Sequence, residues 1–438
     1  MDIVNQVREK GIVGAGGAGF PTHVKLSSVA QLVIVNAAEC EPLLHKDKEI
    51  LENRTEVFLK GLSLTMEAVS ADRAIIGIKE KHLELIDFLK TRIDDAIELF
   101  PLRDFYPAGD ELTLIYETTG RVVEPGKLPI SQGIIVNNVE SIFNIGNEAP
   151  VTEKYLNVAG HVDRTNTLTV PIGISFKEVI DYARPTIDNY KVLVGGPMMG
   201  RIASDLSEPV TKTTAALIVL PEDHQLVTKY TTIDSKRTVD RIGKSACDQC
   251  TLCTELCPRY LLGHPIQPHK AMRALVFSDP TQQNILAETH TLYCCECNLC
   301  SFIACPEGLF PSTVCVNAKR LLTEEKISYQ GDPASGPHPL ADYRRTPSKK
   351  LKQMLDLNQF KDEGPLSDFA YRPAHLKVML RQHIGVPAEP VVKTGDQVKK
   401  NQKLATAGSN LGSEIHCPAD GRITEVTADY ITVQVTTL

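Results

Sequence analysis

The distribution of cysteine along the chain limits what this sequence can fold into more than any other feature. Of the twelve cysteines in 438 residues, nine lie between Cys247 and Cys305, Cys315 follows shortly after, and Cys40 and Cys417 stand far away. A disulfide framework would spread its cysteines over a small secreted domain. One dense cluster in a chain of this length indicates metal instead.

These cysteines form two runs of nearly the same spacing. The runs are Cys247-x2-Cys250-x2-Cys253-x3-Cys257-Pro258 and Cys294-x2-Cys297-x2-Cys300-x4-Cys305-Pro306. Three evenly spaced cysteines in a turning loop, completed by a distant fourth, can wrap a cubane of four irons. Structural zinc sites usually have two CxxC pairs, or one such pair with histidines. The spacing therefore predicts two [4Fe–4S] clusters, with zinc or free buried thiols as the weaker alternative.

The pairing of cysteines with clusters is less certain than their number. In two-cluster ferredoxins the cysteine before the proline ligates the other cluster. By that pattern one cluster takes Cys247, Cys250, Cys253 and Cys305, and the other takes Cys294, Cys297, Cys300 and Cys257. However, the second run has one extra residue before its last cysteine, and the adjacent Cys295 offers a competing thiolate. The other three cysteines, Cys40, Cys315 and Cys417, are predicted to be ordinary buried residues.

Composition and charge exclude several classes of protein. The chain has 47 Lys and Arg against 54 Asp and Glu, a formal charge of −7, so we expect no nucleic-acid partner. No apolar run approaches the roughly 18–20 residues of a membrane-spanning helix. The first ten residues also lack an apolar segment of signal-peptide length. We therefore expect a cytoplasmic protein with no membrane span.

Alternating strand-like and helical stretches predict a multidomain α/β protein. Apolar runs at 32–35, 74–78 and 134–136 are separated by helical stretches, one of which is expected over 79–99. This alternation indicates a largely parallel sheet, whose ligands bind at the carboxyl ends of the strands. Further along, two short paired strands, a helix over 175–183 and another strand indicate a compact β-grasp unit.

The same pattern divides the chain into five segments. They are an α/β domain at 1–150, a β-grasp domain with a connection at 151–240, a helical two-cluster domain at 241–325, a linker with short helices at 326–370 and a small all-β domain at 371–438. The linker is expected because the stretch 331–347 is rich in Pro, Gly and Ser.

A glycine-rich loop near the N-terminus is a candidate for binding phosphate. Five glycines fall within the nine residues 11–19, and Lys25 follows. Backbone N–H groups of such a loop can approach phosphate oxygens, and a lysine can add a counter-charge. The loop follows a helical-looking start, however, so it lacks the preceding strand of a dinucleotide-binding fingerprint. Taken alone, an ordinary tight turn is also possible.

Four separated segments resemble, in the same order, the flavin-binding segments of the complex I flavoprotein subunit and of the RnfC family. They are the glycine loop with Lys25, the segment 35–42 with Lys46 and Asp47, the segment 106–111 and the segment 136–140. The resemblance implies FMN as cofactor and NADH as electron donor. Its phosphate contacts would come from Gly16, Gly17, Gly19 and Lys25, and its ring and ribityl contacts from Asn36, Glu39, Asn137 and Asn138. Glu111 would be the catalytic residue beside the hydride-transfer face.

The rest of the chain extends this resemblance. Residues 383–404 resemble a biotinyl/lipoyl-type barrel-sandwich fold, and the hairpin tip at 413–421 has no lysine to modify, so we expect an unmodified domain. RnfC proteins carry this domain at the front. Here it comes last, as in the cobalamin reductases of propanediol-utilisation microcompartments, the family to which the whole chain is most similar.

That similarity implies both fold and function. The implied fold is an FMN-binding α/β domain, an SLBB-like β-grasp unit, a ferredoxin-like two-cluster domain and a C-terminal barrel-sandwich-hybrid domain. The implied acceptor is a corrinoid, or a corrinoid-handling protein such as an adenosyltransferase. A shell protein is a further implied partner, and the implied location is the interior of a bacterial microcompartment.

We therefore expect an NADH-dependent flavo-iron–sulfur oxidoreductase that reduces corrinoid cobalt. The alternative is an RnfC-like, non-catalytic electron-transfer subunit of a larger membrane-associated complex. A scaffold whose clusters only hold domains together is the least favoured hypothesis. Turnover of a dye by the isolated chain with NADH separates the enzyme from the non-catalytic alternative.

Overall fold

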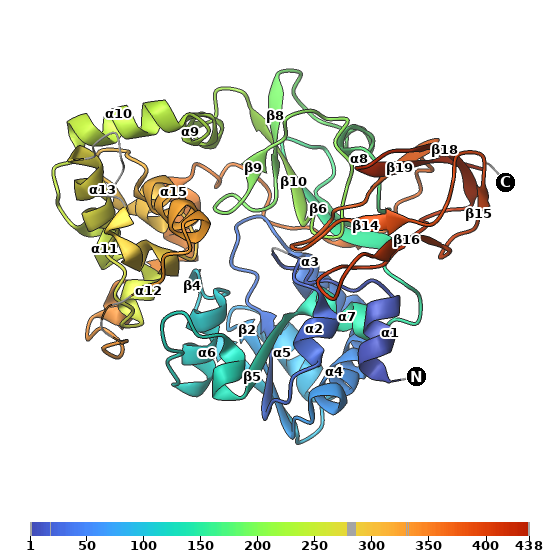
Figure 1. Ribbon diagram of the computed structural model, residues 1–438, viewed down its shortest axis with the longest axis horizontal. Helices are drawn as coiled ribbons and strands as arrows, with labels where there is room; N and C mark the ends of the chain where they lie inside the picture. Colours follow the sequence, from blue (N-terminus) through green and yellow to red (C-terminus); the bar gives the residue numbers. More distant parts are fainter. Residues whose placement is uncertain (1, 18, 278–285, 330, 332, 437–438) are drawn as a thin grey trace.

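The computed structural model describes residues 2–17, 19–277, 286–329, 331 and 333–436. Figure 1 shows an α/β unit from the N-terminal part of the chain, a second sheet beside it, a lobe of helices on one side and a β unit on the other. The helical lobe and the C-terminal β unit lie at opposite ends of the molecule (Figure 1). No helix in the described ranges is long and apolar enough to cross a bilayer.

The N-terminal unit is built on a four-stranded parallel sheet in the order β3-β2-β1-β5. Its strands are β1 (Leu32–Ala37), β2 (Arg73–Lys79), β3 (Ile97–Leu102) and β5 (Ile134–Asn138). Helices pack on both faces, and therefore the strands are continuous apolar runs. Val33 and Val35 face one hydrophobic core, and Ile34 faces the other. The helices are α1 (Ile3–Glu9), α2 (Thr22–Leu26), α3 (Lys46–Asn53), α4 (Thr55–Val69), α5 (Leu83–Lys90), α6 (Glu111–Thr119), the 3-10 helix η1 (Pro129–Gln132) and α7 (Val139–Gly146).

Two glycines allow α4 and α7 to cross in close contact. A Cβ atom on Gly61 would lie 1.9 Å from the carbonyl oxygen of Ile142, and one on Gly146 would lie 2.0 Å from that of Val57. Larger side chains would force the helices apart. The close crossing fixes α7, and with it Asn138, whose side chain caps the start of this helix at the carboxyl end of β5.

The prediction of one helix over 79–99 was wrong. The helix α5 ends at Lys90, and the edge strand β3 begins at Ile97. Between them the side chain of Asp94 accepts a hydrogen bond from the backbone N–H of Ala96 at 3.0 Å, a turn that competes with helix continuation. The strand was missed because its apolar residues continue the helical spacing of α5.

The second sheet has the β-grasp arrangement that the sequence predicted. It has six strands in the order β12-β7-β6-β10-β8-β9, of which the edge strand β12 (Leu366–Ser367) comes from far along the chain. β6 and β7 form an antiparallel pair, and β10 lies parallel to β6 and antiparallel to β8. The side chain of Ser175 and that of Glu178 form a capping box that starts α8. The elements are β6 (Glu153–Gly160), β7 (Asn166–Pro171), α8 (Phe176–Ala183), β8 (Tyr190–Val194), β9 (Arg201–Ile202) and β10 (Ala216–Pro221).

The helical lobe carries both cysteine runs in short helices and turns. Prolines occupy the first turns of three of its helices, where their missing N–H costs nothing. Its core is continuous with the β-grasp sheet, since Ile218 and Leu220 of β10 belong to the same hydrophobic cluster as Met272 and Phe302. The elements are α9 (Gln225–Ile233), α10 (Lys236–Ala246), α11 (Leu252–Glu255), α12 (Pro258–Leu261), α13 (Pro268–Val276), η2 (Thr289–Tyr293), the π-helical turn η3 (Cys300–Ala304) and α15 (Pro311–Glu324).

The segment predicted as a linker is fastened to two sheets. β11 (Thr346–Pro347) pairs with β4 (Phe105–Tyr106), and β12 (Leu366–Ser367) pairs with β7. Between them lies α16 (Ser348–Met354), and the 3-10 helix η4 (Ala341–Tyr343) precedes β11. The segment therefore runs back across the molecule from the helical lobe to the C-terminal unit.

The C-terminal unit packs two small antiparallel sheets, ordered β13-β19-β18-β15 and β14-β16-β17. Its core is shared with the β-grasp sheet, because Leu376 and Ile431 join the hydrophobic cluster that contains Val179 of α8. The strands are β13 (His375–Met379), β14 (Ala388–Pro390), β15 (Gln397–Val398), β16 (Lys403–Ala407), β17 (Ile415–His416), β18 (Gly421–Val426) and β19 (Tyr430–Val435).

Candidate functional site

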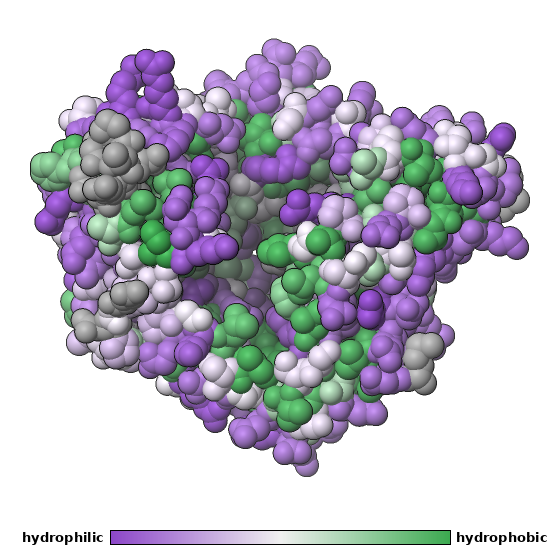
Figure 2. All heavy atoms as spheres, viewed as in Figure 1, coloured by the Kyte–Doolittle hydropathy of each residue, from purple (hydrophilic) through white to green (hydrophobic). Residues whose placement is uncertain are grey.

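A cavity of about 270 Å³ lies at the carboxyl ends of β1 and β5, where three units of the chain meet. This is the edge of a parallel sheet where ligands bind. Figure 2 shows that the face of the molecule is hollowed near its centre, between the helical lobe and the two sheets. The predicted site residues that line the cavity are Gly16, Asn36, Glu39, Glu111, Asn138 and the predicted cluster ligand Cys297. The wall also contains residues for which no individual role was predicted. Glu41, Lys46, Asp47 and Asp110 belong to the segments that resemble flavin-binding segments, Cys295 is the competing thiolate of the second run, and Met199 comes from the β-grasp unit.

The remaining predicted flavin residues lie beside the cavity. A Cβ atom on Gly17 would meet nothing within 4 Å, so the loop is open there to a ligand. Glycine suits position 19 because its φ is +76° and a Cβ atom there would lie 2.8 Å from the Thr213 side chain and 3.0 Å from the Cα atom of His383. Lys25 Nζ donates to the carbonyl of Val136 at 2.7 Å. Asn137 is buried, and its Nδ2 has no partner within the described residues.

Two asparagines are held in fixed orientations at the cavity wall. Asn36 Nδ2 donates to the carbonyl oxygen of Gly109 at 2.8 Å, which ties β1 to the loop before α6. Asn138 Oδ1 accepts from the N–H of Glu140 at 3.0 Å, and its Nδ2 donates to Asp47 Oδ2 at 2.6 Å. Both amides are therefore oriented before any ligand arrives, which lowers the entropic cost of binding.

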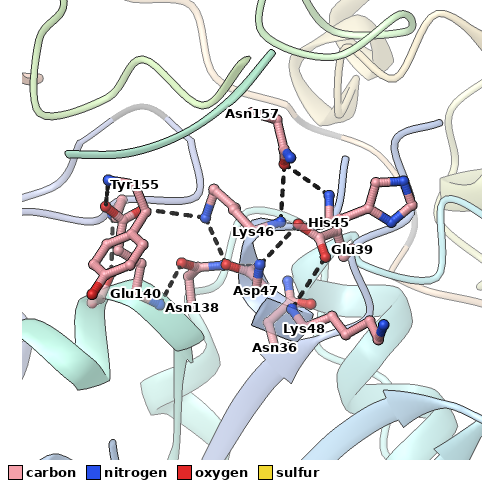
Figure 3. Close-up of polar contacts among 12 residues, drawn as sticks. Asn36, Glu39, His45, Lys46, Asp47, Lys48, Asn138, Glu140, Tyr155 and Asn157 are labelled. Atoms are coloured by element: carbon pink, nitrogen blue, oxygen red, sulfur yellow. Dashed lines mark hydrogen bonds and ion pairs between the residues drawn. The ribbon is translucent and has the colours of Figure 1, made fainter. Parts of the chain in front are cut away.

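A buried charge network lies under the cavity and joins the two sheets (Figure 3). Lys46 Nζ lies 2.6 Å from Asp47 Oδ1 and 3.2 Å from Glu140 Oε2. Lys154 of β6 pairs with the same Glu140 carboxylate. All four side chains are buried, and their charges sum to zero, as a low-dielectric interior requires. Asn157, also on β6, accepts from the backbone N–H of Lys46 at 2.9 Å.

This network shifts the pKa values of its lysines in opposite directions. Burial by itself would lower the pKa of Lys46. The neighbouring carboxylates of Asp47 and Glu140 together have the larger effect, so the pKa of Lys46 is raised. Burial lowers the pKa of Lys154 to about 8, because Glu140 compensates only in part. Lys154 is therefore the less fully compensated of the two cations.

Two carboxyl groups in the cavity wall have raised pKa values. Burial, followed by the charge of Asp47, raises the pKa of Glu39 to about 7, and Glu39 accepts from the N–H of Asp47 at 3.0 Å. Burial also raises the pKa of Glu41 to about 7. Glu41 Oε2 accepts from the N–H of Met198 at 2.8 Å, while its Oε1 has no partner in the described part of the chain. Both groups can hold or release a proton near neutral pH.

The two cysteine runs share an unusual backbone conformation. In each run, the two residues that flank the second cysteine have positive φ. They are Gln249 (60°) and Thr251 (69°) around Cys250, and Glu296 (62°) and Asn298 (58°) around Cys297. None is glycine, so each conformation costs about 1 kcal/mol or more. The matching pairs of left-handed residues turn both loops in the same way. Such a turn is what three closely spaced thiolates need to surround one cluster.

The thiols fall into two groups. After burial, the groups that raise the pKa of Cys253 are Cys250, Cys247 and Cys305. The pKa of Cys297 is raised instead by Cys295, Cys300 and Cys257. Among the neighbouring cysteines, Cys294 and Cys257 raise the pKa of Cys300 most. These effects place Cys247, Cys250 and Cys305 near Cys253, and they gather Cys257, Cys294, Cys297 and Cys300 in a second group that also contains Cys295.

The sulfur atoms also have the backbone donors that suit a bound cluster. The N–H of Glu296 donates to Cys294 Sγ at 3.4 Å, and the N–H of Leu309 donates to Cys305 Sγ at 3.3 Å. No three described His, Cys, Asp or Glu side chains converge on a point that would hold a single metal ion. A cubane is bound differently, through four cysteine thiolates around the cluster.

The three remaining cysteines are placed differently from one another. Cys315 and Cys417 are fully buried, in agreement with the prediction. Cys40 is only half-buried and lines the cavity, so the prediction of an ordinary buried cysteine was wrong for it. It lies at the cavity because it follows Glu39 in the turn after β1, where the positive φ of Glu39 bends the chain.

Comparisons with known proteins assign the units. The chain matches family models for the Nuo51 FMN-binding domain at 7–147, the 4Fe-4S dicluster domain at 246–310 and the RnfC barrel sandwich hybrid domain at 359–437. The second match contains all eight predicted ligands. These matches confirm the predicted multidomain α/β fold, with its FMN-binding, two-cluster and barrel-sandwich units.

Similar proteins match along nearly the whole chain. Cobalamin reductase PduS of Citrobacter freundii is 41% identical over 437 residues, which cover 98% of this chain and 96% of that protein. The protein of the same name from Salmonella typhimurium strain LT2 is 40% identical over 438 residues, which cover 99% of this chain and 96% of that protein. One component of a Na⁺-translocating ferredoxin:NAD⁺ oxidoreductase complex from Acetobacterium woodii is 33% identical, but over only 59% of this chain and 58% of that component. The chain belongs to the PduS family of cobalamin reductases.

Proposed function

We propose that the chain is an NADH-dependent oxidoreductase that passes electrons through FMN and two [4Fe–4S] clusters to the cobalt of a corrinoid. One observation carries this proposal: the cavity at the carboxyl ends of β1 and β5 has cysteines of the second run in its wall. A flavin site and a cluster site that share a wall suit single-electron transfer between them. The relatives named cobalamin reductase, aligned over 96% of their length, support the corrinoid as acceptor.

The cavity has the polar groups that an FMN molecule needs. FMN supplies the ability to accept a hydride and release single electrons. Asn36 and Asn138, already fixed by hydrogen bonds, would hold its ring and ribityl chain, together with Glu39 and the unpartnered amide of Asn137. The open backbone around Gly17 would receive the phosphate, with Gly16, Gly19 and Lys25 as the other predicted contacts.

The carboxyl groups of the wall would manage protons. Glu39 and Glu41, with pKa values of about 7, can exchange a proton near neutral pH without becoming fully charged in a buried site. Glu111 lies farther out, with a partly exposed side chain 3.7 Å from Lys25 Nζ. A carboxylate beside a lysine at the mouth of the cavity is suited to orient NADH, so Glu111 remains the proposed catalytic residue.

The eight cysteines grouped above would hold the clusters. Cys247, Cys250, Cys253 and Cys305 would hold one cluster, and Cys257, Cys294, Cys297 and Cys300 the other. Burial raises the pKa of Cys253 and of Cys294 to about 12, so these groups remain thiols until iron binds and displaces their protons.

The acceptor would reach the chain free or on a corrinoid-handling protein such as an adenosyltransferase. We also propose that the chain works inside a bacterial microcompartment, next to a shell protein. The support for both is membership of the PduS family along the whole chain.

A second candidate function is that of an electron-transfer subunit like RnfC. The match to the RnfC barrel sandwich hybrid domain and the relative from Acetobacterium woodii favour it. That relative aligns with only 59% of the chain, whereas the cobalamin reductases align with 98–99%. The reductase is therefore the better supported of the two.

The deciding experiment follows electrons in the purified, anaerobic protein. Iron, sulfide and FMN are counted first, and NADH is then mixed with the protein in a stopped-flow spectrometer. We expect flavin bleaching, then cluster bleaching, then reduction of added aquacobalamin. NADPH serves as the donor control, and Glu111→Gln should slow the first step alone. A flavin that bleaches without later cluster reduction contradicts the electron path, and absence of NADH-to-dye turnover favours the RnfC-like function.

A further inference from the structure

A second cavity, of about 490 Å³, shares the exposed side chain of Met199 with the flavin cavity. It lies at the border between the β-grasp unit and the helical lobe, where β9 and α9 adjoin (Figure 1). Its wall comes from the segment 199–204, α9, the second cysteine run and α15. None of the predicted FMN or cluster residues, all of which the structure describes, lines it. We call it the lobe cavity.

Two polar side chains of α15 line the lobe cavity with their hydrogen-bonding groups free. Thr313 and Asn317 are four residues apart, so they lie on the same face of the helix. Neither side chain forms a hydrogen bond with any residue that the structure describes. A hydroxyl and a carboxamide can each donate and accept. This side of the cavity therefore suits a ligand whose groups also do both.

Each helix and strand around the lobe cavity also contributes an apolar side chain. Ile202 of β9, Ile233 of α9 and Val316 of α15 are half-buried, so part of their apolar surface remains accessible. The buried ring of Tyr230 adds to this surface, and its hydroxyl is already bonded to the carbonyl oxygen of Pro197 at 3.0 Å. The cavity thus combines apolar contacts from three elements with the free polar groups of α15.

The charges of the wall argue against a phosphate-bearing ligand. Arg201, the one cation among the described residues that line the lobe cavity, is paired with Glu208 at 2.5 Å. The carboxylate of Glu296 is paired with Lys319 at 2.7 Å. The remaining charge is the exposed carboxylate of Asp234, which repels an anion. Recognition of a nucleotide would need free cations for its phosphates, so the cavity suits a ligand with uncharged polar groups.

The second cysteine run forms one side of the lobe cavity. Glu296 and Asn298, on either side of Cys297, both line it. The N–H of Glu296 donates to Cys294 Sγ at 3.4 Å. Asn298 Nδ2 donates to the carbonyl oxygen of Met198 at 2.6 Å, which fixes this side to the β-grasp unit. A molecule bound in the lobe cavity therefore lies directly beside residues that would hold a cluster.

We propose that the lobe cavity is the binding site for the corrin ring of the acceptor, an inference that rests on the proposed function. A corrin ring is a flat macrocycle with apolar faces and uncharged carboxamide groups around its edge. The apolar side chains would contact the ring, and Thr313 and Asn317 would exchange hydrogen bonds with its carboxamides. Small-molecule sites measure about 300–1,000 Å³. The lobe cavity lies within this range but is too small for a whole cobalamin, so we expect the nucleotide tail to stay in solvent.

The test measures binding to the oxidised holoprotein, with no NADH present. The probe is cobinamide, a corrinoid without the nucleotide tail, and equilibrium dialysis gives its affinity. The double variant Thr313→Ala with Asn317→Ala removes both free polar groups, and Val316→Trp fills the cavity. Arg320→Ala, an exposed change on the same helix, is the control. Iron, sulfide and FMN counts show that each variant retains its cofactors.

We expect the unchanged protein to bind cobinamide and aquacobalamin with similar affinity, because the tail makes no contact. The double alanine variant should bind cobinamide about tenfold more weakly, since two hydrogen bonds are lost. Val316→Trp should abolish binding, and Arg320→Ala should leave it unchanged. If the tryptophan variant does not fold, the double alanine variant decides.

Hydrogen exchange followed by mass spectrometry locates the bound probe. Cobinamide should slow exchange in the segment 199–204 and at the end of α9. Equal affinities of the double alanine variant and the unchanged protein, no binding of cobinamide, or protection only outside the lobe cavity would overturn the inference. The proposed function fails separately, if the unchanged protein does not reduce aquacobalamin with NADH, whether or not cobinamide binds.

Discussion

At the scale of single residues, the most informative groups are carboxyls that burial keeps partly protonated. Glu41 follows β1, and burial raises its pKa to about 7 from an ordinary value of 4.5. Between these pH values the folded chain holds a proton on Glu41 that the unfolded chain has lost. The stabilisation from this proton is complete below pH 4.5 and disappears as the pH rises through 7, because the folded state then has to bury a charge.

The substitution Glu41→Gln tests this pH dependence. Glutamine keeps an oxygen for the N–H of Met198 and does not titrate in this range. Each pKa unit corresponds to about 1.4 kcal/mol, so Glu41 should make the unchanged protein a few kcal/mol less stable at pH 7 than at pH 4.5. The variant should lack this part of the pH dependence. Thermal unfolding of the anaerobic holoprotein across that range measures it. Glu148→Gln, an exposed surface change, is the control, and equal slopes in all three proteins would contradict the assignment.

At the scale of elements, the two cysteine loops depend on left-handed residues that are not glycine. Thr251 has a φ of 69° at the start of α11, directly after Cys250. A β-branched residue is unfavourable in this conformation. The loop keeps it because the flanking cysteines require the turn, and we expect the bound cluster to supply the energy that holds it.

Proline and glycine at position 251 give opposite expectations. Proline fixes φ near −65° and so forbids the left-handed turn, whereas glycine adopts it without strain. Thr251→Pro should therefore lose the cluster that Cys247, Cys250, Cys253 and Cys305 would hold, which is about half of the iron of a two-cluster protein. Thr251→Gly should keep all of it. Iron and sulfide analysis with dithionite-reduced EPR measures both, and full iron content in Thr251→Pro would contradict the role of the turn.

The sequence predicted those elements whose residues form a recognisable pattern within a short stretch of chain. The strands β1, β2 and β5 stand out as apolar runs, and the spacing of the cysteines predicted a two-cluster domain, which matches the 4Fe-4S dicluster model at 246–310. The edge strand β3 was missed because its apolar residues continue the spacing of α5. The wall residues Met199 and Cys295 could not be predicted, because only the packing of three units brings them to the cavity. Lys154 likewise looks like a surface charge in the sequence, since lysine is rarely buried without a partner.

At the scale of the whole molecule, buried ion pairs join the units. Lys154 of β6 and Glu140 of α7 connect the β-grasp sheet to the flavin unit under the cavity. Removing one partner of a buried pair leaves the other charge uncompensated, which costs about 3–5 kcal/mol. Lys154→Met should therefore destabilise the protein strongly, and the double variant Lys154→Met with Glu140→Gln should cost clearly less than the sum of the single changes.

Thermal and urea unfolding of the four proteins complete this cycle. The exposed pair Lys60–Glu148, at 3.3 Å, is the matched control, because exposed pairs contribute about 1 kcal/mol or less. Lys60→Met should therefore change stability little. Additive effects of the Lys154 and Glu140 changes would show that the pair does not couple the two units.

A second lysine joins three units at one point. Lys212, in the β-grasp unit, donates from Nζ to the carbonyl oxygens of Gly11 at 2.7 Å and Glu414 at 2.7 Å. It is buried, so Lys212→Met would remove this donor from both oxygens. Ser413 Oγ still donates to the Gly11 oxygen at 3.1 Å, so we expect a cost of about 1–3 kcal/mol. The loss should loosen the glycine loop and the C-terminal unit together, since one amino group holds both.

Hydrogen exchange followed by mass spectrometry can detect this joint loosening. We expect faster exchange in Lys212→Met both in the loop after α1 and around β17, with the core strands of each unit still protected. Lys400→Met is the matched control, because Lys400 also links the C-terminal unit to β6, through Glu153 at 2.6 Å, but in an exposed pair. Faster exchange around β17 alone would mean that Lys212 stabilises only the C-terminal unit. The glycine loop would then depend on its other contacts, such as that of Gly19 with Thr213, to keep its place at the cavity.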